Sequence, residues 1–231
     1  MVNLNVGSFN VQGLANDKKR KEIIHWLHGK NMNIYFLQET HSSNENFKIV
    51  QDDWEGRCLF SNKNTASAGV MILFNTNFEY KLENVITDSD GPYLICTIVV
   101  NNEQIVLGNY YGLNYDDLYL LEDFCNKVNQ FDDLPMILGG DWNMVMDKID
   151  KKVGSLVLTH KKNREQLRQF IGINDLVNIW RIVNPIEQRY PWRQKSPAVH
   201  CRLDIFLVYV GLGNITRKQI SVTDSRATTH L

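Results

Sequence analysis

The sequence predicts an α+β fold, a sandwich in which two packed β-sheets of mixed strand direction are flanked by helices. The chain has 231 residues, 43% of them hydrophobic and 22% charged, which is ordinary globular composition and sufficient for a sizeable core. Short apolar runs bounded by turn residues recur along the chain and indicate strands. A few amphipathic segments lie among them without strict alternation, which disfavours a Rossmann arrangement. Since no repeat or linker interrupts the chain, we expect one domain over residues 1–231.

The expected elements follow from the period of the apolar residues. Strands are predicted where Val, Ile, Leu, Phe and Tyr gather in short runs, at residues 2–9, 33–38, 69–74, 93–100, 104–110, 136–138 and 203–210. Helices are predicted where apolar residues share one helical face, at residues 17–29, 116–130 and 160–171. In the first helix, Asp17 is the expected N-cap and Gly29 the expected stop.

Charge and cysteine content exclude several classes of protein. Lys plus Arg number 25 and Asp plus Glu 26, giving a net charge of −1, so any polyanion site must be local. The four cysteines lie far apart with no C-x-x-C pair, which disfavours a disulfide scaffold and a cysteine-ligated zinc site. The first residues lack the features of a signal peptide, and the apolar runs are too short to span a bilayer. We expect a reducing intracellular compartment and no membrane partner.

Polar side chains end three of the apolar strands. Asn10 ends the first, Glu39 follows the second, and Asp141 with Asn143 follows two glycines after a third. Ligand sites commonly form at such ends. Carboxylates and amides are hard oxygen donors, which suit Mg²⁺ with retained waters and a phosphate substrate. Each end taken alone is more typical of a solvated terminus or a turn than of a site, so the prediction rests on the three together.

A further carboxylate, Asp204, precedes the last expected strand. A buried carboxylate there requires a partner, and His230 is a candidate because a carboxylate on one imidazole nitrogen raises the basicity of the other. The residues alone do not pair the two.

Five motifs follow one another along the chain. They are S-F-N-V-Q-G-L (8–14), L-Q-E-T-H (37–41), N-Y-Y-G-L-N (109–114), L-G-G-D-W-N (138–143) and C-R-L-D-I-F-L-V (201–208). In this order they resemble the endonuclease/exonuclease/phosphatase superfamily. Within it, L-Q-E-T-H, R-Y-P-W-R (189–193) and C-R-L-D-I-F-L-V look most like endonuclease domains of LINE-type retrotransposons that lack long terminal repeats. The resemblance implies a four-layer α/β sandwich and Mg²⁺-dependent nicking of DNA.

The resemblance also implies roles for individual residues. Glu39 would be the principal metal ligand, with Asn10 close to metal and phosphate, and Mn²⁺ is expected to substitute for Mg²⁺. Tyr111 and Asn143 would hold the scissile phosphate, and Asn114 would contact the substrate.

Proton transfer would involve three further residues. Asp141 would orient or deprotonate the attacking water, and Asp204 would brace His230, which would face the phosphate. Whether Asp141 or His230 is the general base stays open at this point, because a carboxylate and an imidazole can both serve.

The implied biology is that of a mobile element. Nicking one strand of a double-stranded DNA target would supply a 3′-OH for target-primed reverse transcription, in the nucleus. A reverse transcriptase is expected to follow in the full protein, and the isolated domain is expected to be a monomer.

Two basic segments indicate where DNA would bind. Residues 148–168 hold seven basic and two acidic residues, a net charge of +5, and residues 189–202 hold four basic residues and no acid. Such segregation supports a polyanion on one face. Tyr190 and Trp192 fit two interpretations, base stacking or one strand's core face. The residues predicted to contact DNA are Asn114, Lys162, Arg164, Arg189, Trp192, Arg193 and Arg202.

The end of the chain departs from the family. The family has Ser-Asp-His where this chain has Thr228, Thr229 and His230, so a neutral Thr replaces an acid near the metal and should weaken Mg²⁺ binding. The family also continues into one further strand, so we expect the last strand to be truncated at Leu231. Two alternatives remain, a phosphatase or phosphodiesterase acting on another phosphate ester, and a catalytically weakened DNA-binding module.

Overall fold

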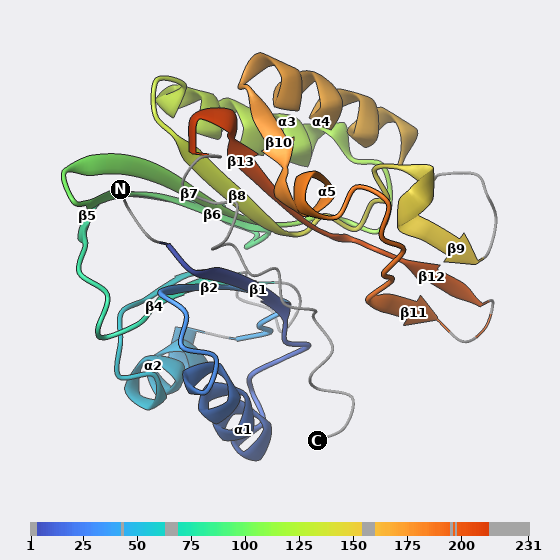
Figure 1. Ribbon diagram of the computed structural model, residues 1–231. Coiled ribbons are helices and arrows are strands. Elements are labelled where there is room, and N and C mark those ends of the chain that lie inside the picture. The colour runs from blue at the N-terminus through green and yellow to red at the C-terminus, as the bar shows by residue number, and fades with distance from the viewer. Residues whose placement is uncertain are drawn as a thin grey trace.

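Two β-sheets pack face to face in the computed structural model (Figure 1). The structure describes residues 4–42, 44–62, 69–153, 160–194, 196 and 198–212. The first sheet has the order β1-β2-β4-β3, and the second has the order β10-β13-β8-β7-β6-β5. β1 and β2 are parallel, as are β7 and β8, while the other pairs in these sheets are antiparallel. The predicted α+β fold with two mixed sheets is therefore confirmed.

The strand bounds are as follows. The first sheet contains β1 (Val6–Asn10), β2 (Ile34–Gln38), β3 (Cys58–Ser61) and β4 (Val70–Phe74). The second contains β5 (Lys81–Thr87), β6 (Tyr93–Val100), β7 (Glu103–Tyr111), β8 (Met136–Asp141), β10 (Leu176–Asn178) and β13 (Asp204–Tyr209).

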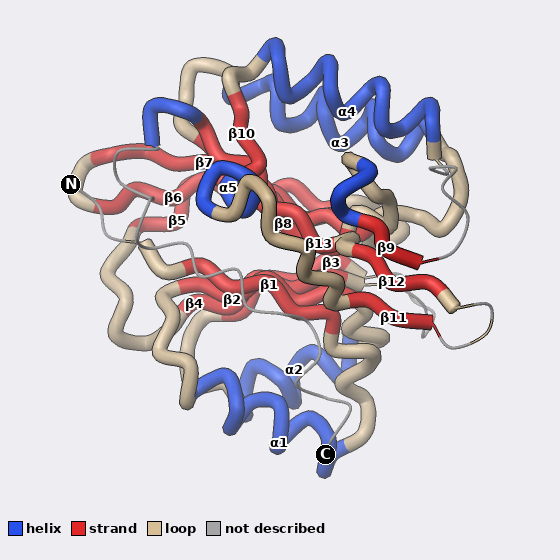
Figure 2. Tube along the Cα trace, turned by 45° about the vertical axis from the view of Figure 1, so that its right-hand side comes forward, coloured by secondary structure: helices blue, strands red, loops and turns tan. Residues whose placement is uncertain are grey.

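Helices cover the outer faces of both sheets, which gives four layers (Figure 2). The first sheet is covered by α1 (Asp17–His28) and α2 (Asn44–Asp53), and the second by α3 (Leu118–Val128) and α4 (Lys161–Ile173). A short α5 (Ile179–Val183) and three 3₁₀ turns, Asn129–Phe131, Lys148–Asp150 and Val210–Leu212, complete the helical elements of the described ranges. None of these helices has the length and apolarity that crossing a membrane requires.

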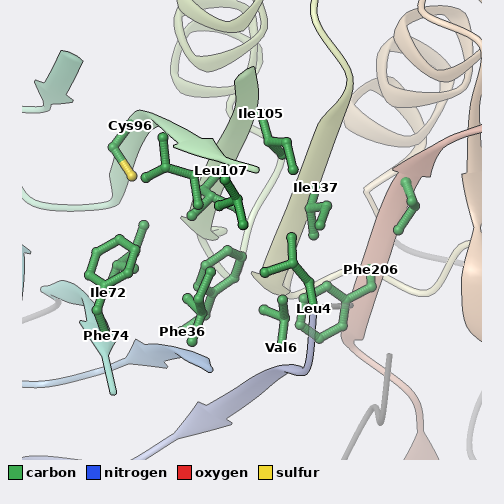
Figure 3. Packing of buried hydrophobic residues seen from close by; sticks show 14 of the residues in the cluster. Leu4, Val6, Phe36, Ile72, Phe74, Cys96, Ile105, Leu107, Ile137 and Phe206 are labelled. Carbon is green, nitrogen blue, oxygen red and sulfur yellow. The ribbon is translucent and has the colours of Figure 1, made fainter. Parts of the chain in front are cut away.

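The main core lies between the two sheets (Figure 3). Phe36 of β2 stacks on Phe206 of β13 with ring centroids 5.9 Å apart, and Ile72, Leu107 and Ile137 pack around them. Apolar side chains of both inner faces are fully buried here because each strand presents them at every second residue. Separate clusters join each sheet to its helices, so both sheets are packed on their outer faces as well.

A third, small sheet extends from the sandwich (Figure 1). It has the order β11-β12-β9, with β9 at Lys151–Val153, β11 at Trp192–Gln194 and β12 at Val199–Cys201. Trp192 is half-buried against Val145, Cys201 and Leu203, and Tyr190 is buried as well. The core-face interpretation of these two aromatic residues fits the structure better than base stacking.

Several predicted bounds differ from the structure. The N-cap of α1 is Asn16, whose side chain accepts from the Lys19 amide, and Asp17 is the first helical residue. β8 continues to Asp141, beyond the predicted 136–138. The sequence pattern missed α2 and β5; β5 is an edge strand with mostly exposed side chains, so it lacks the apolar alternation that marks a strand.

Candidate active site

Four strands of two sheets bring their polar ends to one edge of the sandwich. Parallel β1 and β2 end at Asn10 and Gln38, directly before Glu39. Parallel β7 and β8 end together, with Tyr111 in register with Asp141. Parallel pairing places carboxyl ends at the same edge. The strand ends that the sequence marked as polar thus converge in space.

Asn10 joins the two carboxylates across the mouth of the sandwich. Its Nδ2 donates to Glu39 Oε1 at 2.7 Å and to Asp141 Oδ2 at 3.1 Å. Its Oδ1 accepts from the Gln12 amide at 3.2 Å, which leaves one lone pair of that oxygen for another partner. The amide therefore holds two acids close together without adding negative charge.

Glu39 is held by its backbone and by a phenol. Its φ of 51° lies in the left-handed region, which costs a non-glycine residue on the order of 1–3 kcal/mol and is typical of functional sites. The Gly13 amide donates to the Glu39 carbonyl at 2.6 Å. Tyr111 Oη donates to Glu39 Oε1 at 2.9 Å, and His41 Nε2 lies 3.9 Å from Oε2. Oε2 thus keeps room for a cation or water.

Asp141 is fixed by the turn that follows β8. Gly140 has a φ of +139°, and a Cβ there would lie 2.0 Å from the Tyr110 carbonyl oxygen, so only glycine fits. The Asn143 amide donates to Asp141 Oδ1 at 3.0 Å, and Asn143 Nδ2 donates to the Gly112 carbonyl at 2.7 Å. These bonds tie the turn to the end of β7.

Burial is the main influence on the pKa of the Asp141 carboxyl. It raises the pKa of Asp141 to about 6, with the Glu39 charge acting in the same direction, while hydrogen bonds from Asn143 and Asn10 oppose it. Burial and the neighbouring Glu39 also raise the pKa of the Tyr111 phenol, so Tyr111 stays protonated and remains a donor. One acid poised near neutral pH beside a second acid is the pattern of proton-transfer sites.

A buried polar network supports the site from beneath, and the sequence reasoning missed it. Gln38 Nε2 donates to Ser8 Oγ at 2.9 Å and to Asn109 Oδ1 at 2.8 Å. Asn109 Nδ2 donates to the carbonyls of Leu37 and Met71 at 3.0 and 2.8 Å. Gln38 and Asn109 are 0% exposed. Polar residues inside otherwise apolar strands were the available signal.

Asp204 lies where its strand meets Asp141. It is the first residue of β13 and pairs directly with Asp141 in the antiparallel ladder, so the two side chains share a sheet face. Asp204 is buried, and its role in bracing a histidine stays a prediction. Its predicted partner His230, with Thr229, lies outside the described residues.

Comparison with known proteins decides the family. The model of the Endonuclease/Exonuclease/phosphatase family matches residues 4–212. The chain belongs to this family. The expectation from the five motifs is thereby confirmed at the family level.

A curated relative comes from a mobile element. The Transposon TX1 uncharacterized 149 kDa protein of Xenopus laevis is 25% identical over 221 residues, which cover 94% of this chain and 17% of the relative. The chain thus corresponds to a small part of that longer protein.

Solved structures share the family's fold. An AP endonuclease from Archaeoglobus fulgidus superposes with a TM-score of 0.72 at 20% identity, covering 91% of this chain and 88% of that one. The 3′ phosphatase NExo from Neisseria, bound to product DNA hairpin, gives 0.69 at 17% identity and covers 96% of both chains. At these identities the likeness establishes the fold, in agreement with the four layers.

Most of the residues predicted to contact DNA are exposed. Asn114 lies in the loop after β7, and Lys162 lies in the first turn of α4, where Asp116 Oδ2 accepts from its backbone amide at 3.5 Å. Arg193 of β11 is also exposed, as is Arg189 in the segment before that strand.

Two arginines predicted to bind DNA are buried instead. Arg164 is 8% exposed, and its Nη1 lies 3.5 Å from the Val145 carbonyl. Arg202 is 3% exposed, lies 3.5 Å from Asp150 and stacks over Trp180 at 4.0 Å. Guanidinium groups enclosed in this way have no open face for a phosphate, so neither residue belongs to the DNA-contacting set that we propose.

The family's divalent metal can be tested against the donor set. Among the described residues no group of three or more His, Cys, Asp or Glu is placed to hold a metal ion. Mg²⁺ does not require one, because it keeps several waters and is commonly held by one or two carboxylates together with substrate phosphates. The Glu39 carboxylate with nearby Asp141 supplies that kind of open, oxygen-only site, so these two acids fit the group. Asn10 turns its Nδ2 toward both acids, so its Oδ1 would reach a cation at Glu39 once the amide flips.

Proposed function

We propose that this chain is a Mg²⁺-dependent endonuclease that nicks one strand of double-stranded DNA and leaves a 3′-OH that primes reverse transcription. The observation that carries the proposal is the contact of Asn10 with both Glu39 and Asp141, on a fold that AP endonucleases share. The transposon relative favours a mobile-element context. The full protein would add a reverse transcriptase and act in the nucleus, with this single domain working as a monomer.

The metal, held by Glu39 with Asn10, would neutralise charge on the phosphate and lower the pKa of a bound water. Asn10 orients the Glu39 carboxylate, and Tyr111 donates to the same carboxylate oxygen. Since Tyr111 stays protonated, its single hydroxyl proton could move from Glu39 to a phosphate oxygen when substrate binds. Asn143 lies beside Asp141 and would bind a second phosphate oxygen.

Proton transfer requires a base near the attacking water. Asp141 is buried, and its pKa of about 6 leaves it ionised and moderately basic at neutral pH. His230, braced by Asp204, is the competing base or the group that stabilises developing charge. We favour Asp141 because its carboxylate belongs to the Asn10 cluster, which is Asn10 with Glu39, Tyr111 and Asp141. Its Oδ2 lies 3.1 Å from Asn10 Nδ2.

A supercoiled plasmid tests the proposal. Relaxed circles should form with Mg²⁺, should also form with Mn²⁺, and should be absent with EDTA. A simple phosphomonoester and an inositol phosphate are tested separately as alternative substrates. Hydrolysis of these without nicking would favour the alternative of a phosphatase or phosphodiesterase, which the likeness to a 3′ phosphatase keeps in view.

A weakened DNA-binding module is the second alternative, and Thr229 favours it because the family has an acid there. Restoring the acid with Thr229→Asp should raise nicking and lower the Mg²⁺ concentration needed. If the wild type and Thr229→Asp both bind DNA and neither nicks, the binding module is the better description.

A further inference from the structure

A cationic hollow opens on the small third sheet, away from the Asn10 cluster. Its volume is about 450 Å³, large enough for a phosphate group with its water. Three of its side chains, Lys152, Arg189 and Arg193, carry fixed positive charge, and a single acid, Glu187, lies among them. The hollow is lined by Lys152, Glu187, Gln188, Arg189, Tyr190, Arg193 and His200.

The positive groups come from separate segments that the fold brings together. Arg193 of β11 pairs directly with His200 of β12, so both side chains lie on the same sheet face. Lys152 lies in β9, which pairs with β12 from the other side. In a chain with a net charge of −1, this gathering of three cations from two segments, beside His200 of a third, marks a local site for an anion.

Buried ion pairs hold the wall of the hollow in place. Asp150 is 2% exposed and binds the guanidinium of Arg181 through Nε at 3.2 Å. Arg181 Nη1 donates to the Glu187 carbonyl at 2.9 Å, and Arg202 Nη2 donates to the Arg189 carbonyl at 3.0 Å. The two arginines thus fix two backbone positions of the wall from behind.

Arg202 is itself fixed on three sides. Its backbone amide donates to the Asp150 carbonyl at 2.9 Å, its guanidinium lies 3.5 Å from the Asp150 carboxylate, and it stacks over Trp180. Arg189 also lies over Trp180, with Cζ 6.0 Å from the ring centroid. A wall held this firmly loses little conformational entropy when an anion binds.

We propose that this hollow is a subsite for a backbone phosphate of the DNA substrate, and that Arg181 and Arg202 are positioning residues for it. The proposal rests on the proposed function in taking DNA as the substrate. Arginine and lysine are the side chains that bind phosphate oxygens. Since such interactions read no base edge, the subsite would anchor the duplex without specifying sequence.

The position of the hollow fits the substrate. β12 ends at Cys201, and Asp204, which pairs with Asp141, begins β13 shortly after it. The chain from His200 to Asp204 spans at most about 14 Å, and each DNA strand rises about 3.4 Å per nucleotide. The His200 edge of the hollow therefore lies within about 14 Å of Asp204, a separation that about four nucleotides of a bound strand would span.

Equilibrium binding of a short duplex in EDTA tests the subsite without any cleavage. Lys152→Gln with Arg193→Gln should weaken binding about tenfold at moderate salt. The negative slope of log K against log salt should also become shallower, by about 0.9 for each phosphate that the variant no longer neutralises. Lys48→Gln, which changes an exposed cation on α2, is the matched control. Affinity and slope equal to those of the control would overturn the proposal, as would wild-type protein that binds no duplex.

Arg181→Lys tests the positioning role, because it keeps a charge toward Asp150 but removes the several fixed N–H donors. The salt slope should fall as in the double variant, while kcat for nicking stays unchanged and KM rises. A lower kcat with an unchanged salt slope would overturn the positioning role. If the wild type fails to nick yet the variants show the reduced salt slope, the subsite stands and the nuclease proposal falls.

Discussion

Asn10 at the end of β1 donates a 3.1 Å hydrogen bond to Asp141 at the end of β8. The two residues belong to different sheets and lie far apart in the sequence. Their contact closes the mouth of the sandwich at the edge where Glu39 also lies. An amide at this point satisfies two carboxylates at once, which an acid or an apolar residue cannot do.

Asn10→Asp should damage the site through charge. The change removes both donated hydrogen bonds and places a third carboxylate beside Glu39 and Asp141, where like charges repel strongly because the site is partly buried. Nicking should fall by at least about 10²-fold, and thermal stability in EDTA should fall as pH rises from 5 to 8. Asn77→Asp, at an exposed turn, is the control. Wild-type nicking by Asn10→Asp would contradict the role of the amide.

Glu39→Ala should abolish cleavage without abolishing binding. Removing the principal metal ligand should lower the nicking rate by at least about 10²-fold, while duplex affinity stays near wild type because DNA binding depends on cations elsewhere. Plasmid nicking and fluorescence anisotropy measure the two effects. Glu83→Ala, on edge strand β5, should change neither. Retained cleavage by Glu39→Ala would remove the metal assignment.

Asp141→Asn should stabilise the metal-free protein in a pH-dependent way. Because the pKa of Asp141 is raised from 3.8 to about 6 in the fold, its protonated form favours the native state, and that contribution is lost as pH rises through about 6. The neutral amide avoids this loss, although it gives up one of the two hydrogen bonds that the carboxylate accepts, at a cost that does not depend on pH. In urea unfolding with EDTA, the stability difference between variant and wild type should shift in the variant's favour by up to about 3 kcal/mol between pH 4 and pH values above 7.

A difference between Asp141→Asn and wild type that is constant from pH 4 to pH 8 would show that the carboxyl is not buried as described. Nicking by the variant should be at least about 10²-fold slower if Asp141 is the base.

Asn109→Leu should destabilise the whole fold. Asn109 bonds Gln38 and the carbonyls of Leu37 and Met71, so leucine would leave several buried polar groups without that partner, at a cost on the order of 2–3 kcal/mol. Urea unfolding measures it. Asn84 lies on the exposed edge strand β5, and its side chain donates a hydrogen bond to Thr97. Asn84→Ala should cost much less. Equal effects for the two variants would contradict the structural role of the network.

The fold was predictable where burial leaves a mark in the sequence. β6 has the predicted bounds of 93–100 because nearly all its side chains are buried, which makes the run continuously apolar. β5 was missed because its exposed edge position permits polar residues. The small third sheet was missed because its strands are short and carry charges.

The site was predictable in its residue types and only partly in its placement. Polar ends on apolar strands pointed to Asn10, Glu39 and Asp141, but their contact depends on two sheets packing face to face, which no local pattern specifies. The burial of Arg164 was not predicted because its charge alone, without its helical face, favoured an exposed position. Arg164 lies one turn before Leu167 and so shares the buried side of α4.

A crystal soaked in Mn²⁺ tests the central claim most directly, because the ion's anomalous scattering locates it without reference to activity. The account predicts one peak beside the Glu39 carboxylate, within coordination distance of Asn10 Oδ1 and absent from crystals of Glu39→Gln. Mn²⁺ bound elsewhere, with none at Glu39, would contradict it.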